Sequence, residues 1–156
     1  EHAAMSYAVY LGAIGWNHAG WLDEFYPEDM PEDWRLAFYN TQFRCVYLEC
    51  AAWAGLAPEI WAQWAGETQE TFRFVLESSG SAGTDAAAVE AFGGRAVIVA
   101  SGRDAGLIGF DAASDLRELT AQVREQMAGK SLYLISRDAD LTRLLQVRTA
   151  IELMGL

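Results

Sequence analysis

One imidazole and two carboxylates are the side chains of this sequence best suited to chemistry: His18, Glu49 and Glu77. Imidazole nitrogen and carboxylate oxygen together bind divalent metal ions, and the same groups perform acid–base catalysis. No compact spacing motif such as H-E-x-x-H joins the three residues. The alternative is that all three are solvated residues at loop ends, or that Glu77 pairs with Arg73 or Arg44. A divalent metal is therefore one candidate cofactor, and acid–base chemistry without a metal is the other option.

Aromatic side chains are concentrated in the segment GAIGWNHAGWLDEFYPEDMP, residues 12–31. Aromatic rings can stack on a ligand such as a sugar or a base. Core packing is the alternative, because large aromatic side chains dominate hydrophobic cores. The candidate ligand-binding residues, from this segment and the second predicted strand, are Trp16, Trp21, Tyr47 and Trp53.

Alternating apolar runs and helical periodicities predict an α/β fold with a mainly parallel sheet, in a single domain over residues 5–156. Residues 1–4, ahead of Met5, are set aside as a candidate tag remnant. The segment 107–110 follows the preceding strand too closely for a helical crossover, so we expect an antiparallel hairpin partner or a loop there. The predicted strands are 7–15, 45–51, 72–78, 95–100 and 132–135, and the predicted helices are 31–41, 58–65, 84–92, 114–128 and 138–154.

The charge balance limits the classes of partner. The formal net charge is −11 at pH 7, and residues 1–80 contain 12 acidic and 3 basic side chains. Such a surface repels phosphate groups, which disfavours nucleic acids and anionic membranes as partners. No apolar stretch approaches the roughly 18 residues of a membrane span, and the first residues lack the pattern of a secretory signal. We therefore expect a cytoplasmic protein.

The first half of the chain also follows a known pattern of glycine and aromatic residues. The matching positions are Gly12, Gly15, Trp16, Trp21, Phe25, Tyr26, Pro27, Trp34, Tyr39, Phe43, Val46, Trp64, Phe72 and Phe74. In order and spacing they resemble the domain of unknown function 72 family, also called YecE-like proteins, and the closing segment 132–156 resembles that family's last strand and helix more loosely. The resemblance implies a TIM-barrel-like ancestry. A complete eight-stranded barrel needs roughly 200 residues or more, so a chain of 156 residues lacks several central strand–helix units.

The departures from the family pattern fall on polar positions. The tyrosine of the first turn is His18, the Glu and Asn of the second strand are Tyr47 and Glu49, and the lysine that ends the third strand is Glu77. Alternate residues of a strand share a face of the sheet, so Tyr47 and Glu49 face the same side. In the family pattern these are inward positions at the barrel mouth. The resemblance therefore implies that His18, Glu49 and Glu77 converge at the carboxyl ends of the first three strands.

Two functions follow from these departures. The loss of the family's polar residues predicts a non-catalytic or diverged member that acts as an interaction or small-ligand-binding protein. The alternative is a metal-assisted hydrolase that uses His18, Glu49 and Glu77.

A part-barrel also leaves sheet edges and apolar faces uncovered, which proteins normally avoid. We therefore expect the chain to form a homo-oligomer.

Overall fold

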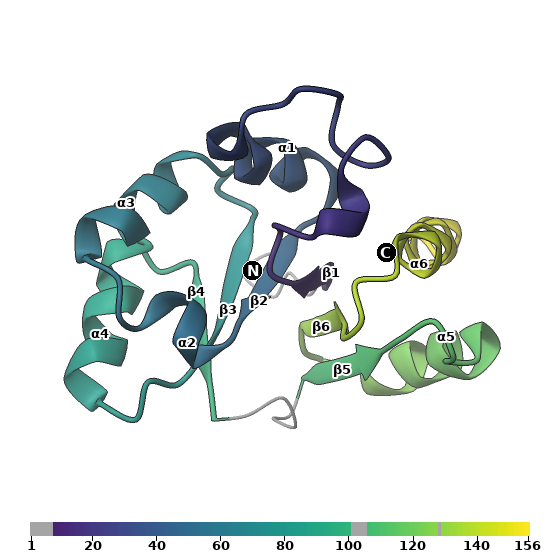
Figure 1. Ribbon diagram of the computed structural model, residues 1–156. Helices are drawn as coiled ribbons and strands as arrows, with labels where there is room; N and C mark the ends of the chain where they lie inside the picture. Colours follow the sequence, from purple (N-terminus) through teal and green to yellow (C-terminus); the bar gives the residue numbers. More distant parts are fainter. Residues whose placement is uncertain (1–7, 101–105, 128) are drawn as a thin grey trace.

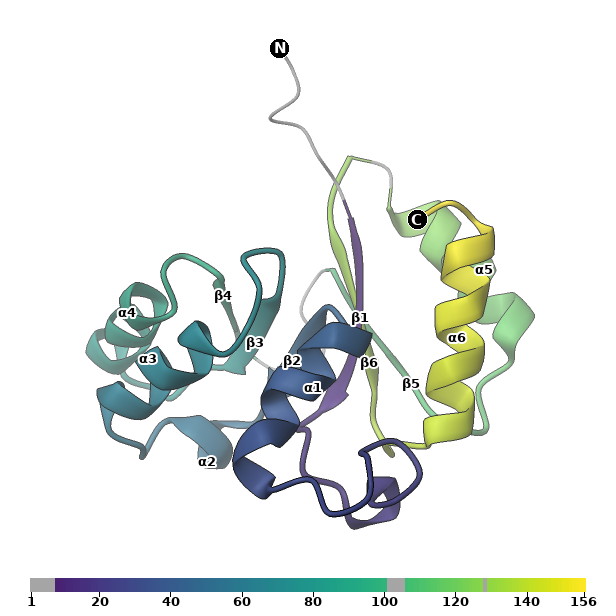
Figure 2. The same cartoon turned by 90° about the horizontal axis from the view of Figure 1, so that it is seen from above.

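The computed structural model describes residues 8–100, 106–127 and 129–156, and its centre is a parallel sheet of six strands surrounded by helices (Figures 1 and 2). The strands are β1 (Val9–Ile14), β2 (Cys45–Leu48), β3 (Arg73–Glu77), β4 (Ala96–Val99), β5 (Leu107–Phe110) and β6 (Leu132–Ser136). The helices are the short 3-10 turns η2 (Ala19–Trp21) and η3 (Glu32–Trp34), and α1 (Arg35–Gln42), α2 (Cys50–Trp53), α3 (Pro58–Gly66), α4 (Ala82–Ala91), α5 (Leu116–Gln126) and α6 (Leu141–Leu153).

The strand order, β4-β3-β2-β1-β6-β5, is that of a barrel with one gap. On one side of β1 lie β2, β3 and β4 in turn, and on its other side lie β6 and then β5. All five pairings are parallel. Because the last strand returns beside the first, as it does when a barrel closes, the missing units belong between β4 and β5. The sheet is thus a curled half-barrel with helices between its strands (Figure 1), and the predicted α/β class with a parallel sheet is confirmed.

The prediction for residues 107–110 is wrong. This segment forms β5, which pairs in parallel with β6, from Leu107 opposite Tyr133 to Phe110 opposite Ser136. A short connection between two strands excludes parallel pairing only when the two strands are neighbours in the sheet, as was assumed for β4 and residues 107–110. They lie at its opposite edges, so no helical crossover between adjacent strands is needed.

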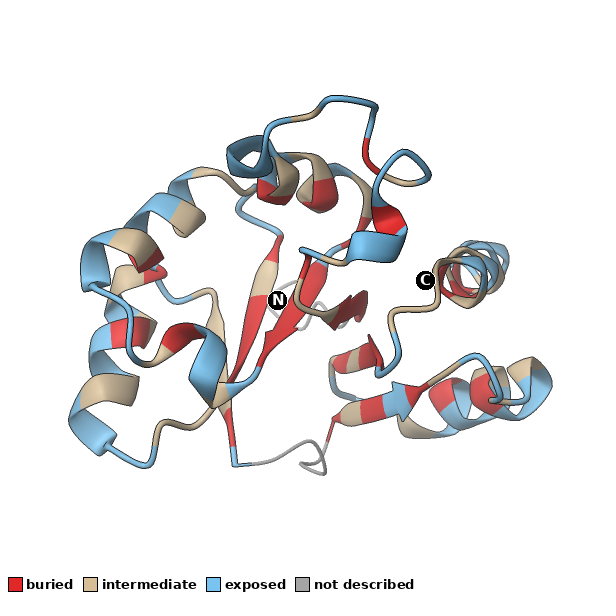
Figure 3. Cartoon of the chain, in the orientation of Figure 1, coloured by how far each residue is buried: buried red, intermediate tan, exposed pale blue. Residues whose placement is uncertain are grey.

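The two faces of the sheet have different roles. Trp21, Tyr26 and Tyr39 have exposed fractions of 1%, 1% and 0%, and they pack between the convex face and its helices. Helix surfaces that face the sheet are buried, whereas those that face outward are exposed (Figure 3). The aromatic segment 12–31 therefore builds core on the convex side. The concave side carries a separate apolar cluster of Tyr10, Cys45, Tyr47, Val75, Val99 and Ile135.

β4 and β5 form the two edges of the sheet, and each pairs with a single neighbour among the described strands. A second copy of the chain on these edges stays a prediction. Within the described residues, no helix combines the length and apolar character needed to cross a membrane.

Candidate functional site

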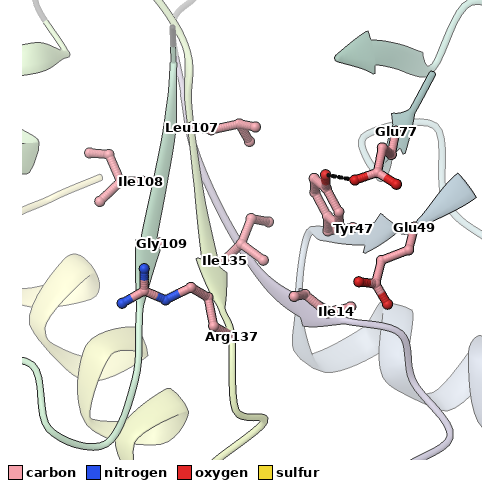
Figure 4. A pocket seen from close by; sticks show the side chains of 9 residues that line it. All are labelled: Ile14, Tyr47, Glu49, Glu77, Leu107, Ile108, Gly109, Ile135 and Arg137. Atoms are coloured by element: carbon pink, nitrogen blue, oxygen red, sulfur yellow. Dashed lines mark hydrogen bonds between the residues drawn. The ribbon is translucent and has the colours of Figure 1, made fainter. Parts of the chain in front are cut away.

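A cavity lies on the concave face, where the carboxyl ends of the parallel strands meet. Its volume is about 230 Å³. Its floor is apolar and its rim carries ionisable groups, with two carboxylates on one side and a guanidinium on the other (Figure 4). We call this cavity the mouth pocket. It is lined by Ile14, Tyr47, Glu49, Glu77, Leu107, Ile108, Gly109, Ile135 and Arg137.

Glu77, the last residue of β3, is held in place by neighbours on two elements. Its Oε2 accepts a hydrogen bond from the Tyr47 hydroxyl at 3.1 Å, and its Oε1 accepts one from the Cys50 backbone N–H at 3.1 Å. Its own carbonyl accepts a hydrogen bond from Trp53 Nε1 at 2.9 Å. The strand predicted over residues 45–51 ends at Leu48 in the structure. α2 begins at Cys50, the residue whose backbone N–H donates to the Glu77 carboxylate. The carboxylate is therefore oriented before any ligand arrives.

Glu49 stands beside Glu77 on the same side of the pocket (Figure 4). It is exposed and occupies the position just before α2, without forming a side-chain cap. Within the described part of the chain, its carboxylate accepts no hydrogen bond and joins no ion pair. Glu49 can consequently turn toward a ligand at little cost, whereas Glu77 is fixed.

Arg137 follows β6 and borders the opposite side of the pocket (Figure 4). Its Nη2 forms an ion pair with Asp111 Oδ2 at 3.3 Å, and 59% of its side chain is exposed. The side chain lies across Gly109, where a Cβ atom would come within 3.1 Å of Arg137 Cδ. Since Asp111 offsets the charge of Arg137, the two glutamates leave the described part of the rim with an excess of negative charge.

His18 lies elsewhere. Its Nε2 is 3.3 Å from the Gly15 carbonyl oxygen, and its ring centroid is 4.5 Å from that of Trp21. It borders two other surface hollows, one of them beside Asp138 and Asp140. The structure thus brings Glu49 and Glu77 together without His18. The described residues contain no group of three or more His, Cys, Asp or Glu side chains arranged to hold a metal ion.

Of the four candidate stacking residues, only Tyr47 lines the mouth pocket. Trp21 and Trp53 are 1% and 0% exposed, and their indole N–H groups donate to the carbonyls of Ala139 and Glu77 at 2.9 Å each. Trp16 packs edge-on against Trp64, with ring centroids 5.0 Å apart. These three indoles serve the core, and Trp53 additionally supports the backbone of Glu77.

Sequence reasoning missed the opposite wall of the pocket. Ile135 is an inward residue of β6, Arg137 directly follows that strand, and Leu107 and Gly109 come from β5. The period-two pattern that selected Glu49 would also have selected Ile135 and Arg137 from the segment LYLISR. Leu107 and Gly109 were out of reach, since nothing local places β5 beside β6.

Comparison with known proteins completes this picture. The family described as "Protein of unknown function DUF72" matches residues 10–92, which is more than half of the chain. The chain belongs to the DUF72 family. A crystal structure of a DUF72 family protein from Thermotoga maritima is similar to it, with a TM-score of 0.63 and 12% sequence identity over 94% of this chain and 100% of that chain. No curated protein matches the sequence. At this identity the DUF72 neighbour supports the fold alone, so the function has to be argued from the mouth pocket.

Proposed function

We propose that this DUF72 member is a small-ligand-binding protein whose mouth pocket takes a compact organic cation, an ammonium group carried on an apolar body. The observation that carries the proposal is the convergence of Glu49 and Glu77 on one cavity with an apolar floor. A cavity on the carboxyl side of parallel strands is also where proteins of this architecture bind their ligands.

The charge of the rim favours a cation. Glu49 and Glu77 stand together, while the positive charge of Arg137 is offset by Asp111 at 3.3 Å. An ammonium group has three N–H donors and no acceptor, so it matches carboxylate oxygens. Hydrogen bonds between charged partners are roughly twice as strong as neutral ones. The net charge of −11 attracts cations to the whole molecule and so raises their association rate.

The floor of the pocket favours an apolar body behind the charge. Ile14, Leu107 and Ile135 contribute aliphatic surface, and Tyr47 adds an aromatic wall. Burying apolar ligand area contributes about 25 cal/mol per Å². The volume of about 230 Å³ corresponds to roughly eight atoms of water size at about 30 Å³ each. A single six-membered ring with an amine is therefore the right size.

The orientation of Glu77 makes binding efficient. Tyr47 and the Cys50 N–H already fix its carboxylate, so no side-chain entropy of Glu77 has to be lost when the ligand arrives. Glu49, without such contacts in the described structure, closes on the ligand second. Glu77 thus provides a carboxylate in a fixed orientation, and Glu49 provides one that can adjust to the ligand.

The proposal is tested by isothermal titration calorimetry with cyclohexylammonium, together with cyclohexanecarboxylate and cyclohexanol as charge-reversed and neutral probes of the same shape. We expect the ammonium alone to bind measurably, and Glu77→Gln and Glu49→Gln each to weaken it about tenfold, which corresponds to about 1.4 kcal/mol. Glu59→Gln, at an exposed position on α3, is the matched control. Equal binding of all three probes, or unchanged affinity in both pocket variants, would overturn the proposal.

The same variants separate a metal site from an organic-cation site. Thermal unfolding is followed with Mg²⁺, Mn²⁺ and Zn²⁺ in turn. A stabilisation by one ion that Glu77→Gln abolishes would contradict the organic-cation proposal and favour the metal-assisted alternative. We expect no ion to stabilise the wild type more than Glu77→Gln.

A further inference from the structure

A second hollow lies at the same end of the sheet as the mouth pocket but on the other face. Its volume is about 260 Å³. Leu48, the last residue of β2, is part of it, whereas the preceding Tyr47 lines the mouth pocket. Alternate residues of a strand face opposite sides of the sheet, so the two sites are separate. We call this hollow the tryptophan hollow, and its lining residues are Gly15, Trp16, Asn17, His18, Leu48, Ala52 and Trp64.

The two indole N–H groups of this hollow have no protein partner among the described residues. Trp21, Trp53 and Trp61 are 1%, 0% and 2% exposed, and each donates from Nε1 to a backbone carbonyl at 2.9 Å. Trp16 is also buried, with an exposed fraction of 8%, yet neither Trp16 nor the half-buried Trp64 donates such a bond within the described structure. Buried polar groups are normally hydrogen-bonded. Trp16 and Trp64 therefore depart from the pattern of the other buried tryptophans.

The indole nitrogens of Trp16 and Trp64 are open to solvent and not sealed in the core. Among the described residues, the one buried side-chain nitrogen or oxygen without a hydrogen-bond partner is Arg35 Nε. The two indole nitrogens are thus accessible to water. Because both residues line the hollow, a ligand bound there can take the place of that water.

The two indole rings form a right-angled corner. Their planes are 89° apart and their centroids are 5.0 Å apart. A ligand ring can therefore lie with its face on one indole and its edge toward the other. Trp64 is the more exposed of the two and offers the face. A ring with an apolar face and a polar edge matches this corner.

The polar neighbours of the corner offer further hydrogen bonds. Asn17 Oδ1 accepts one from Arg35 Nη1 at 3.3 Å, which leaves the amide N–H groups of Asn17 for a ligand. His18 Nε2 lies 3.3 Å from the Gly15 carbonyl oxygen, so with the proton on Nε2 the ring presents Nδ1 as an acceptor. The described residues that line the hollow include no Asp, Glu, Lys or Arg. The hollow therefore suits an uncharged ligand that both accepts and donates hydrogen bonds.

We propose that the tryptophan hollow binds one pyranose ring of an uncharged sugar. The axial C–H groups on one face of the ring stack on Trp64, and the hydroxyl groups accept hydrogen bonds from Trp16 and Asn17. At about 30 Å³ for each atom of water size, the volume of about 260 Å³ holds roughly nine atoms, so most of one ring fits. Nucleotides are disfavoured, because residues 1–80 contain 12 acidic and 3 basic side chains. The inference uses no residue of the mouth pocket and does not depend on the function proposed there.

The test uses uniformly ¹⁵N-labelled protein, in which each indole N–H gives its own NMR signal. We expect methyl β-glucopyranoside, whose ring substituents are all equatorial, to shift the Trp16 and Trp64 signals saturably. The signal of Trp61, which donates to the Trp53 carbonyl, should stay unchanged. Cyclohexanol and adenosine are the comparison probes, and weaker binding of both supports a sugar site. No saturable shift of Trp16 and Trp64, or equal or tighter binding of either comparison probe, would overturn the proposal.

Substitutions locate the binding groups. Trp64→Phe removes the indole N–H but keeps an aromatic ring, so it should weaken glucoside binding about three- to tenfold. Trp64→Ala also removes the stacking face and should weaken it further. Asn17→Ala, at an exposed position, should weaken it about threefold.

Trp34→Phe is the matched control for these variants. Trp34 is 63% exposed and does not line the hollow, so this change should leave the affinity as it is. Retained Trp53 and Trp61 indole signals show that a variant is folded. A folded Trp64→Ala or Asn17→Ala variant with wild-type affinity for the glucoside would contradict the assignment.

Discussion

The hydroxyl of Tyr47 donates a hydrogen bond to Oε2 of Glu77 at 3.1 Å, joining side chains that are 30 residues apart in the sequence. The two residues belong to β2 and β3, which pair in parallel with Tyr47 opposite Val75. Glu77 is therefore two positions further along the same inward face. The hydrogen bond between these two inward-facing side chains orients the Glu77 carboxylate.

Replacing Tyr47 by phenylalanine should weaken cyclohexylammonium binding about three- to tenfold, because the Glu77 carboxylate loses one of the contacts that orient it. The aromatic wall of the pocket is retained, so the change isolates the hydroxyl. Tyr133→Phe is the control, since the Tyr133 hydroxyl donates no hydrogen bond to the described residues. Calorimetric affinities equal to the wild type in Tyr47→Phe would show that the contact does not orient the site.

Tyr39→Phe tests a second hydroxyl, which bridges β1 and β2. It accepts a hydrogen bond from the Ala13 N–H at 2.9 Å and donates one to the Cys45 carbonyl at 2.7 Å. Burial raises the pKa of Tyr39, which keeps the donor proton in place. The substitution leaves two buried backbone groups unpaired, so the free energy of unfolding should fall by about 2 kcal/mol. Urea denaturation measures it, and a loss no greater than in Tyr133→Phe would contradict this role.

Gly12→Ala should destabilise the fold strongly. A Cβ atom at this position would lie 1.8 Å from the Cys45 carbonyl oxygen and 2.8 Å from the Tyr39 hydroxyl. Both atoms belong to the bridge between β1 and β2, so relief requires the strands to separate. We expect a loss of about 3 kcal/mol or more. Gly20→Ala is the matched control, because no heavy atom lies within 4 Å of its added Cβ. Similar thermal unfolding midpoints for Gly12→Ala and Gly20→Ala would contradict this prediction.

Asp85 should make stability depend on pH in the acid range. Hydrogen bonds from Ser78 and Ser79 hold the pKa of the Asp85 carboxyl below its ordinary value. A carboxyl whose pKa is lower in the folded state stabilises the fold above its unfolded pKa of about 3.9, and this contribution is lost as the pH falls through the folded value. The difference in unfolding free energy between the wild type and Asp85→Asn should therefore shrink from pH 7 to pH 3. A difference that stays constant over this range would refute the assignment.

The sequence was sufficient for the parts of the structure that depend on period and spacing. Alternation along the second and third strands, combined with the family pattern, placed Glu49 and Glu77 at one mouth. The aromatic residues that match the family pattern indicated a barrel-derived fold. The prediction for His18 rested instead on the course of a loop. Gly15, with φ of +75°, turns the chain after β1, and His18 then packs on Trp21. Neither property has a periodic signature.

The partner of an edge strand was also out of reach. β5 pairs with β6, which follows it by a whole helix, while the strand before it lies at the far edge of the sheet. Only the closed order of a barrel predicts that arrangement. The wall of the mouth pocket formed by Leu107 and Gly109 could not be assigned without it.

The most direct test of the central claim is a titration of cyclohexylammonium into protein labelled at the isoleucine δ1 methyl groups. Ile14 and Ile135 line the mouth pocket, whereas Ile60 and Ile151 do not border it. The mouth-pocket proposal predicts saturable shifts of Ile14 and Ile135, unchanged Ile60 and Ile151 signals, and a weaker response in Glu77→Gln. Shifts that are absent, or equal at all four positions, would contradict it.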